Sequence, residues 1–330
     1  MKYLYVLTSD TTDYYLEQAL MSIASLREHT QNGFVSLLVD DITEKTLIES
    51  RRTILGMIDE LKIVTLPDEI NKMQRSRWLK TTMRDYIDGD FLYIDCDTII
   101  SGDLSAIDDL KIEIGAVPDA HTKFNNSYGS RPYVLSVIKR IGFTFSPEPT
   151  YHFNGGLIFS RNTPLCRGFF KEWHKLWQIS RSKGISTDMP SLSQANINCN
   201  QCIQVIDGIW NCQIMSGGLQ YLANAKIIHY FSSNKQENPY LPANEAVLEN
   251  IRRTGLTENM RDKFKNPKTL FAPHTMLISD KSILEFIATF TFLFKRRRLL
   301  KALCRFTDKL YKYKNIIVGA LSRLRIRVCP

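Results

Sequence analysis

Short apolar runs alternate along the chain with longer segments in which apolar residues recur at helical spacing. Over the first hundred residues the runs predict strands and the segments between them predict helices. The expected strands span residues 3–7, 34–39, 61–66 and 91–94, and the expected helices span residues 14–29, 43–58 and 76–86. Strands and helices that alternate in this way favour right-handed βαβ units, so the sequence predicts an α/β fold with a mostly parallel sheet.

The alternation continues less regularly beyond residue 100. Further strands are expected at residues 112–117, 157–160, 205–209 and 226–230, and helices at residues 169–179 and from residue 187. Residues 121–131 are rich in Asn, Ser and Gly, and a loop of that length is typical of a functional or mobile segment. After residue 242 the pattern is helical and increasingly amphipathic.

Two carboxylates follow the apolar run at residues 91–94. Asp95 and Asp97 lie two positions apart, and in extended chain such side chains point the same way. At the end of a buried strand they would repel each other and lose hydration, and a divalent cation removes both problems. An Asp-rich turn without a ligand is the alternative. Ligands of α/β sheets bind at the carboxyl ends of strands, where these acids and residues 8–10 are expected to lie.

The net charge of +9 is concentrated in one region. Residues 281–330 carry 13 Lys and Arg residues and two acids, which leaves 30 basic and 32 acidic residues for the rest of the chain. This distribution favours an anionic surface as partner and not a nucleic-acid cleft through the core. Apolar and basic residues recur from residue 286 onward in an amphipathic pattern typical of helices on anionic membranes. A solvated or partner-binding helix is the alternative.

Other classes of protein are disfavoured by motifs that the sequence lacks. It contains no GxGxxG and no P-loop, which argues against a dinucleotide cofactor and a P-loop NTPase. No apolar run reaches the roughly 18–20 residues that cross a bilayer, and no signal peptide is expected because Met1 leads directly into a strand. Scattered cysteines suit a reducing compartment, and Cys199 and Cys202 form a CxxC without the second pair of a zinc finger.

Four motifs occur in an order that resembles a known family. They are DxD at residues 95–97, FNGG at residues 153–156, D-x-P-x-L at residues 188–192, and a His followed six residues later by Lys at residues 229–235. Over about residues 1–240 the chain resembles the GT-A nucleotide-diphospho-sugar glycosyltransferases, most closely glycosyltransferase family 8. The resemblance implies a Rossmann-like, mostly parallel mixed sheet flanked by helices, a bound Mn²⁺ or Mg²⁺, and a UDP-sugar donor.

The resemblance also implies roles for individual residues. Asp95, Asp97 and His229 match the metal ligands, and Lys235 matches the lysine that contacts the diphosphate. Asp188 and Lys235 are expected to be catalytic. The positions that contact the nucleotide-sugar are matched by Thr8, Ser9, Asp10, Arg77, Asp95, Asp119, Asn154, Gly155, Gly156 and Lys235.

Some positions leave the interpretation open. Arg75 and Lys80 compete with Arg77 for the same role, and the pair Trp210-Asn211 is expected to pack and not to act in the chemistry. Met189 stands where the family has a Gln beside the reacting anomeric carbon, so the sequence does not predict whether the reaction retains or inverts configuration.

Two other functions compete with this interpretation. Residues 95–99 also resemble the DxDxT motif of haloacid dehalogenase-like phosphohydrolases, in which the first Asp is the nucleophile, although Thr98 falls one place early. The second alternative is a non-catalytic, membrane-associated protein that binds sugars.

We therefore predict a metal-dependent glycosyltransferase that moves a hexosyl group from a UDP-sugar to a saccharide or lipid-linked acceptor in bacterial surface glycan synthesis. Residues 1–240 are expected to form the catalytic domain, and residues 241–330 a helical region. The basic tail of that region, about residues 281–330, is expected to bind an anionic membrane surface. The expected location is the cytoplasm, peripheral on the cytoplasmic face of the bacterial inner membrane, and no nucleic-acid partner is expected.

Overall fold

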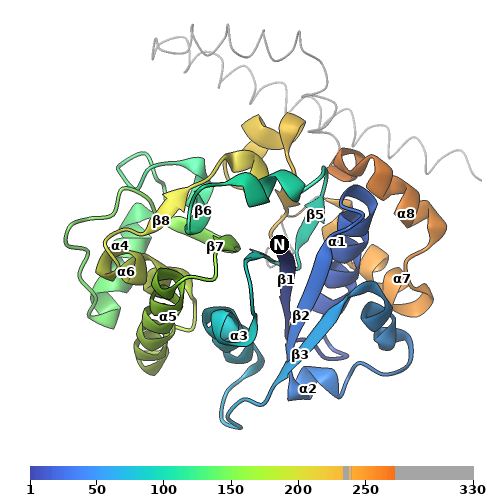
Figure 1. Cartoon of the computed structure of the whole chain (residues 1–330), viewed down its shortest axis with the longest axis horizontal. Coiled ribbons are helices and arrows are strands. Elements are labelled where there is room, and N and C mark those ends of the chain that lie inside the picture. The colour runs from blue at the N-terminus through green and yellow to red at the C-terminus, as the bar shows by residue number, and fades with distance from the viewer. Residues whose placement is uncertain (233–237, 239, 272–330) are drawn as a thin grey trace, which may run out of the picture. The chain divides into compact units, whose positions relative to one another are not determined.

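A mixed β-sheet lies at the centre of the fold. The computed structural model describes residues 1–232, 238 and 240–271, which belong to one compact unit, Met1–Thr275. Within these residues the main sheet has seven strands in the order β3-β2-β1-β4-β7-β6-β8 (Figure 1). The strands are β1 (Lys2–Leu7), β2 (Phe34–Asp40), β3 (Glu60–Val64), β4 (Phe91–Ile94), β6 (Ile114–Pro118), β7 (Phe153–Ser160) and β8 (Ile203–Val205).

The pairing of the strands creates a place where a ligand can bind. β1 pairs in parallel with β2 on one side and with β4 on the other, and β2 pairs in parallel with β3. β7 runs antiparallel to both β4 and β6, and β6 pairs in parallel with β8. The mostly parallel mixed sheet expected from the sequence is confirmed. Because the chain leaves β1 for β2 on one side and reaches β4 on the other, the carboxyl ends of β1 and β4 flank a topological switch point.

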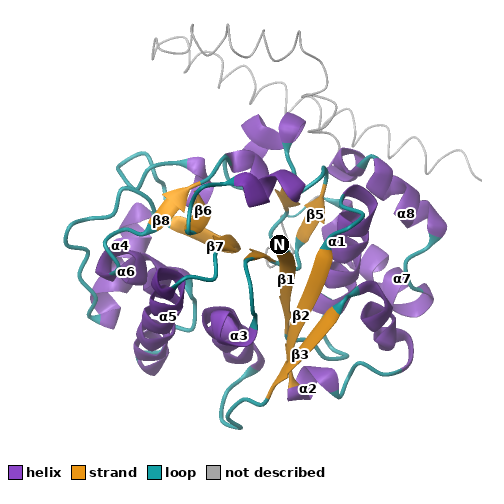
Figure 2. Ribbon diagram, in the orientation of Figure 1, coloured by secondary structure: helices purple, strands orange, loops and turns teal. Residues whose placement is uncertain are grey.

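Helices cover both faces of the sheet (Figure 2). Leu79 of α3, Trp173 of α5 and Leu192 of α6 join the main core with Val6 and Tyr93 of the strands. The other face packs on α1, where the Tyr5 hydroxyl lies 3.0 Å from Ser22 Oγ. The α-helices are α1 (Tyr15–His29), α2 (Asp41–Glu44), α3 (Lys72–Tyr86), α4 (Arg131–Ile141), α5 (Pro164–Ser182), α6 (Met189–Asn198), α7 (Glu245–Thr254) and α8 (Glu258–Lys265).

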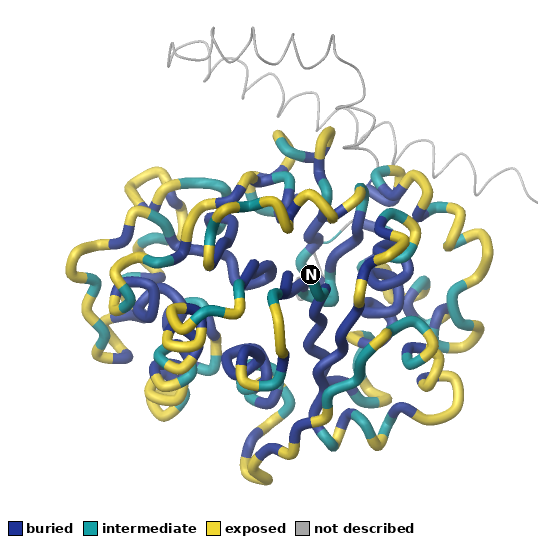
Figure 3. Tube along the Cα trace, viewed as in Figure 1, coloured by how far each residue is buried: buried dark blue, intermediate teal, exposed yellow. Residues whose placement is uncertain are grey.

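The central strands are buried on both faces, which explains their continuous apolar runs (Figure 3). β2 is buried over its last six residues, and all four residues of β4 are buried. Edge strand β3 is only partly covered, with Ile63 half exposed. The same apolar runs therefore identified the strands from the sequence and form the core of the fold.

Helices α7 and α8 pack against α1 (Figure 1). Arg252 of α7 forms an ion pair with the buried Glu17 of α1 at 2.9 Å, and His29 Nε2 lies 2.8 Å from the carbonyl of Phe264 in α8. The boundary expected near residue 240 stays a prediction, and the basic tail at residues 281–330 lies outside the described residues. None of the described helices is both long and apolar enough to cross a bilayer.

The expected helix at residues 43–58 is wrong. The chain forms the short helix α2 and then a 3-10 helix, because side chains compete for the hydrogen-bonding groups of the backbone. Thr46 Oγ1 donates to the Thr43 carbonyl at 2.7 Å, and Arg51 Nε donates to the Thr46 carbonyl at 3.1 Å. The 3-10 helices are η1 (Glu49–Met57), η2 (Ser105–Asp109), η3 (Asp119–His121), η4 (Gly208–Asn211), η5 (Gly218–Asn224), η6 (Leu241–Ala243) and η7 (Pro267–Phe271).

A second, small sheet lies next to the end of β4. It contains β5 (Thr98–Ile100), β10 (Ile227–His229) and β9 (Cys212–Gln213) in the order β5-β10-β9. β5 and β10 pair antiparallel, with His229 opposite Thr98. The stretch 91–100 is therefore divided between two sheets, with the DxD motif at the bend between them.

Candidate functional site

Asp95, Asp97 and His229 meet at the junction of the two sheets. β4 ends at Ile94 and β5 begins at Thr98, so both acids lie on the bend between the strands. The pairing of β10 with β5 brings His229 to the same place from more than 130 residues further along the chain. Among the residues that the structure describes, these three side chains form the group with metal-ligating spacing, and their ligand atoms lie within 4.8 Å of one another.

The charges of this cluster are strongly coupled. His229 Nε2 lies 3.2 Å from Asp97 Oδ1, and the imidazole is almost completely buried. Burial acts to lower the pKa of His229, but the Asp97 carboxylate outweighs burial and the pKa is raised. Burial likewise acts to raise the pKa of Asp97, and the imidazole together with the Ser232 N–H lowers it. The site therefore favours positive charge between these side chains, whether a proton or a cation supplies it.

A chain of hydrogen bonds determines which nitrogen of His229 faces the carboxylates. The backbone N–H of Gly156 donates to Asn154 Oδ1 at 2.9 Å, which orients the Asn154 amide because a backbone nitrogen can only donate. Asn211 Nδ2 donates to the same oxygen at 3.0 Å, so Asn211 Oδ1 faces His229 Nδ1 at 3.1 Å. In the neutral ring Nδ1 then carries the proton, and Nε2 presents its lone pair to the Asp97 side.

Asp119 forms the other end of this hydrogen-bond chain. Its Oδ1 accepts from Asn154 Nδ2 at 3.0 Å, and its Oδ2 accepts from the Tyr128 hydroxyl at 2.7 Å. Ala120 follows with a φ of 52°, in the left-handed region that non-glycine residues rarely adopt, and its N–H donates to Gln213 Oε1. Such backbone is kept only where surrounding contacts impose it, and it is common at functional sites.

The two glycines of the FNGG motif leave room for the charged side chains. A Cβ on Gly156 would lie 2.4 Å from His229 Cε1, so the ring could not keep its position beside a larger residue. A Cβ on Gly155 would lie 3.2 Å from Asp188 Oδ2 and 3.3 Å from Lys80 Nζ. The motif therefore packs directly against both the His229 ring and the Lys80–Asp188 pair.

Asp188 occupies the N-cap position of α6, but its side chain does not cap the helix. The carboxylate instead approaches two cations of α3, Lys80 Nζ at 3.0 Å and Arg77 Nε at 3.3 Å. Trp173 Nε1 donates to the Asp188 carbonyl at 3.2 Å and holds the start of the helix in place. Burial acts to raise the pKa of Asp188, but Lys80 and Arg77 outweigh it and lower the pKa to about 2.

Lys80 connects Asp188 with the DxD motif. Its Nζ lies 3.6 Å from Asp95 Oδ1, and the same oxygen accepts a short hydrogen bond from the Tyr93 hydroxyl. Of the three cations that the sequence left in competition, Arg75 is excluded because it forms a buried ion pair with Asp40. Lys80 and Arg77 both reach the site.

Thr8, Ser9 and Asp10 lie at the carboxyl end of β1, next to β4. Their polar groups bind neighbouring side chains: Ser9 Oγ donates to Asp13 Oδ1 at 2.8 Å, and Asp10 forms an ion pair with Lys72 at 2.5 Å. Burial acts to raise the pKa of Asp10, and the hydrogen bonds from Lys72 and a neighbouring Thr lower it. These residues stand where a nucleoside is expected, but no hydrogen bond or ion pair of the described residues joins them to the DxD cluster.

The structure thus brings most of the predicted residues into one region and adds two, Asn211 and Lys80, to which the sequence assigned no role in the site. Asn211 was expected to pack, but its amide lies between His229 and Asn154; only a pairing in three dimensions shows this role. The sequence identified Lys80 only as one of three cations of α3 that could contact the donor. Lys235 lies outside the described residues. The predicted residues that contact one another here are Asp95, Asp97, Asp119, Asn154, Gly155, Gly156, Asp188, Arg77 and His229.

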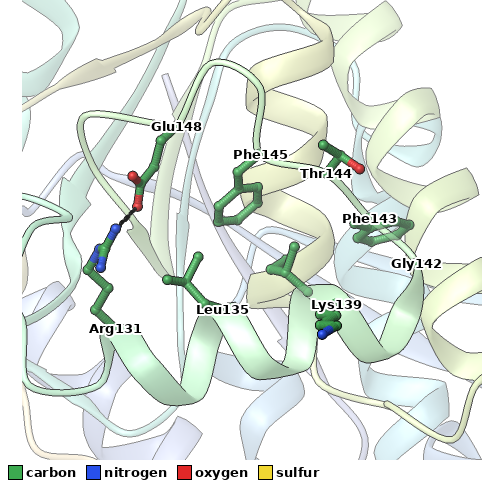
Figure 4. A pocket seen from close by; sticks show the side chains of 9 residues that line it. Arg131, Leu135, Lys139, Gly142, Phe143, Thr144, Phe145 and Glu148 are labelled. Carbon is green, nitrogen blue, oxygen red and sulfur yellow. Dashed lines mark hydrogen bonds and ion pairs between the residues drawn. The ribbon is translucent and has the colours of Figure 1, made fainter.

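A hollow of about 440 Å³ lies elsewhere, beside α4 (Figure 4). Figure 4 shows Arg131 paired with Glu148 at one end and Phe143 and Phe145 along the side. Its lining includes none of the predicted site residues. The DxD cluster therefore remains the candidate active site.

Comparison with protein families identifies the chain. The model of glycosyl transferase family 8 matches residues 6–236, which include all of the site described above. The chain belongs to glycosyltransferase family 8. A search of curated proteins found no match.

A solved structure with a TM-score of 0.50 shows the same fold as this family 8 chain, and two further structures match it with lower scores. An active-site mutant of LgtC is 16% identical with a TM-score of 0.50, and the match covers 80% of this chain and 100% of that one. GlyE from Streptococcus pneumoniae TIGR4 is 17% identical with a TM-score of 0.49, covering 82% of this chain and 64% of that one. The bifunctional glycosyltransferase WbbM is 15% identical with a TM-score of 0.48, covering 70% of this chain but only 45% of that one.

Family membership decides between the enzyme classes that the sequence left open. This family 8 chain is a glycosyltransferase with a GT-A fold. A phosphohydrolase that uses Asp95 as nucleophile and a non-catalytic sugar-binding protein are both disfavoured by the family match.

The residues of the site fit a divalent cation. Family 8 enzymes with this fold generally depend on a divalent metal, and the cluster supplies two partly buried carboxylates and one buried imidazole. Carboxylate oxygens suit Mg²⁺ and Mn²⁺, and the added imidazole suits Mn²⁺. The tautomer imposed through Asn211 leaves Nε2 free to bind metal, as is usual for histidine ligands whose other nitrogen donates a hydrogen bond.

Proposed function

We propose that the protein transfers a hexosyl group from a UDP-sugar to a saccharide or lipid-linked acceptor in a metal-dependent reaction. One observation carries the proposal: the candidate metal ligands Asp95, Asp97 and His229 lie next to a second cluster of Lys80, Arg77 and Asp188. The 3.6 Å between Lys80 Nζ and Asp95 Oδ1 joins the two. A site with this arrangement offers both a place for a metal-bound diphosphate and fixed positive charge beside it.

Departure of the diphosphate is the step that needs this charge. Asp95, Asp97 and His229 would hold Mn²⁺ or Mg²⁺, which when bound stabilises the negative charge that develops on the leaving diphosphate. Lys80 and Arg77 add two protein cations that need no reorganisation, since Asp188 already holds them in position. Lys235, outside the described residues, is proposed to contact the same diphosphate.

Asp188 is better suited to positioning than to accepting a proton. A carboxylate with a pKa of about 2 has little affinity for a proton at neutral pH, because protonation would leave Lys80 and Arg77 without their partner. We therefore assign Asp188 to holding these cations and to contacting the donor sugar. The proton of the acceptor hydroxyl would go to the departing phosphate.

The nucleoside would lie at the neighbouring strand end, where Thr8, Ser9 and Asp10 stand. Asn154 and Asp119 would contact the sugar, since their hydrogen-bond chain runs from the candidate metal ligand His229 toward the strained segment at Ala120. The route from nucleoside to sugar then follows the carboxyl ends of β1 and β4, as in other α/β nucleotide sites.

The place of the reaction is proposed from the charge of the tail. Residues 281–330 carry the excess of positive charge and would hold the enzyme on an anionic membrane surface, on the cytoplasmic face of a bacterial inner membrane. A lipid-linked acceptor in surface glycan synthesis would be presented there. This assignment rests on the sequence alone.

Release of UDP from a panel of UDP-hexoses, with and without Mn²⁺, tests the reaction. Asp97→Asn keeps the shape of the side chain but removes a ligand charge, and we expect it to slow metal-dependent UDP release about 1000-fold. Asp262→Asn makes the same chemical change on the exposed face of α8, and wild-type turnover is expected. Full wild-type turnover in excess chelator would refute the metal role, and no UDP release from any hexose donor would refute the donor class.

A further inference from the structure

A second cavity, of about 330 Å³, lies among α1, η1, α7 and α8, and four of its lining side chains are arginines. They are Arg51 of η1, Arg252 and Arg253 of α7, and Arg261 of α8. The remaining wall is mainly apolar, with Leu16, Leu20, Met57 and Ile251 among its residues. None of the predicted site residues lines this cavity.

The positive charge around the cavity is poorly compensated. Its one acidic lining residue, Glu17, is committed to Arg252, whose Nε lies 2.9 Å from Glu17 Oε1. For Arg51, Arg253 and Arg261 the described part of the chain provides no carboxylate within 4.0 Å. Within this part of the chain, three guanidinium groups thus face one small cavity without an ion-pair partner.

Arg51 is the most unusual of them because it is about nine-tenths buried. Its hydrogen bonds go to neutral acceptors only, the Thr46 carbonyl, Thr46 Oγ1 and Ser9 Oγ, and its buried Nη1 has no partner among the described residues. Burial lowers the pKa of Arg51, which is the physical sign of a charge held without sufficient compensation. A buried cation of this kind is stabilised when an anion binds beside it.

We propose that this cavity is a binding site for a phosphate-bearing anion, distinct from the donor site. Guanidinium groups bind phosphate oxygens through paired, charge-assisted hydrogen bonds, and several arginines converging on one cavity are suited to a group with more than one negative charge. The volume accommodates a diphosphate-sized group with room for a short apolar part against the leucines. The site does not depend on the glycosyl transfer proposed above.

Arg51 also connects the cavity with the donor edge of the sheet. Its Nη2 donates to Ser9 Oγ at 3.0 Å, and Ser9 is one of the residues expected at the nucleoside. An anion bound to the Arg51 guanidinium would therefore interact with a side chain that contacts the carboxyl end of β1.

Calorimetric titration of the full chain with pyrophosphate, in excess chelator, tests the site. The double variant Arg253→Gln/Arg261→Gln removes two exposed cations that make no ion pair within the described residues, so its fold is expected to be intact. We expect its pyrophosphate affinity to fall at least tenfold. Arg140→Gln, an equal change at an exposed position of α4, is expected to bind like the wild type. Asp97→Asn, which alters the candidate metal site, is also expected to retain binding.

Two results would overturn the proposal: no pyrophosphate binding by the wild-type chain, or equal binding by the wild type and the double variant. Vesicles of phosphatidylcholine with phosphatidylglycerol distinguish a lipid headgroup from a free anion. Competition of these vesicles with pyrophosphate for the same arginines would identify a headgroup as the source of the phosphate. Undisturbed pyrophosphate binding in their presence would identify a free anion.

Discussion

Replacement of Asn211 by leucine tests whether the asparagine chain orients His229. Leucine keeps the branching and approximate size of asparagine but removes both polar atoms. The substitution deletes the hydrogen bond between Asn211 Oδ1 and His229 Nδ1 and the one from Asn211 Nδ2 to Asn154 Oδ1. His229 would keep its place in β10, but nothing would hold the proton on Nδ1 or keep the ring plane directed at the carboxylates.

The magnitude follows from the bonds that are lost. Each hydrogen bond contributes about 1 kcal/mol net, and the buried Nδ1–H of His229 is left without a partner, so we expect a loss of about 2–4 kcal/mol in the free energy of unfolding. Metal affinity should fall further than stability alone explains. Removing the group that orients a histidine ligand typically weakens metal binding about 10–100-fold, equivalent to about 1.4–2.7 kcal/mol.

Titration with Mn²⁺ in the presence of UDP, combined with urea unfolding, separates the two effects. Asn196→Leu is the matched control, because Asn196 is equally buried and its Oδ1 accepts the Ile203 N–H at 2.9 Å, away from the metal cluster. It should lose comparable stability and bind Mn²⁺ normally. Asn211→Asp keeps an acceptor for the histidine and should recover most of the Mn²⁺ affinity.

Two outcomes would refute the reasoning. The first is a wild-type dissociation constant for Mn²⁺ in Asn211→Leu, which would show that the ring needs no orienting partner. The second is an equal loss of affinity in Asn196→Leu, which would show that general loosening of the fold and not the tautomer controls the site.

Three further predictions use other features of the molecule. Gly156→Ala should displace the His229 ring and weaken Mn²⁺ binding at least tenfold, whereas Gly168→Ala, where a Cβ meets nothing within 4 Å, should bind normally. Asp188→Asn should destabilise the protein by about 2 kcal/mol at pH 7. Burial is outweighed by two cations, and the pKa of Asp188 is lowered to about 2. In urea unfolding, the stability difference between wild type and Asp188→Asn should therefore shrink as the pH falls from about 4 toward 2. A stability difference that stays constant over this pH range would contradict the prediction. Removal of residues 281–330 should move the protein from the membrane to the soluble fraction, and unchanged fractionation would refute the role of the tail.

The sequence predicted the parts of the fold that depend on local patterns. Buried strands such as β4 need continuous apolar runs, so the run at Phe91–Ile94 was enough to predict a strand there. The helix expected at residues 43–58 was wrong because side chains compete there for the backbone groups, and one of these side chains, Arg51, also donates to the distant Ser9 Oγ. Hydrophobic spacing carries no information about such a contact, since Arg51 is a charged residue that happens to be buried.

The residues of the candidate site also fall into two groups, those that the sequence could propose and those that it could not. Asp95 and Asp97 could be proposed because hard cations bind carboxylate oxygens, and His229 could be proposed because its position matches a family motif. Asn211 could not, because asparagine is common in turns and its role here exists only through two partners that are each at least 18 residues away in the chain. A residue that orients a ligand has no chemical signature of its own.

Helical geometry alone could have divided the three candidate cations of α3 into two groups. At 100° per residue, Arg77 and Lys80 lie about 60° apart on the helix surface, whereas Arg75 lies on the far side from them. The sequence therefore predicts that Arg77 and Lys80 share one face of the helix and that Arg75 lies on the other. It does not predict which face lies toward the carboxyl end of β4. Two carboxylates from other elements decide this: Asp40 of β2 pairs with Arg75, and Asp188 before α6 pairs with both Arg77 and Lys80. Because each pair is largely buried, exchanging the faces would leave charges unpaired in the core, and the helix is held with Lys80 toward Asp95.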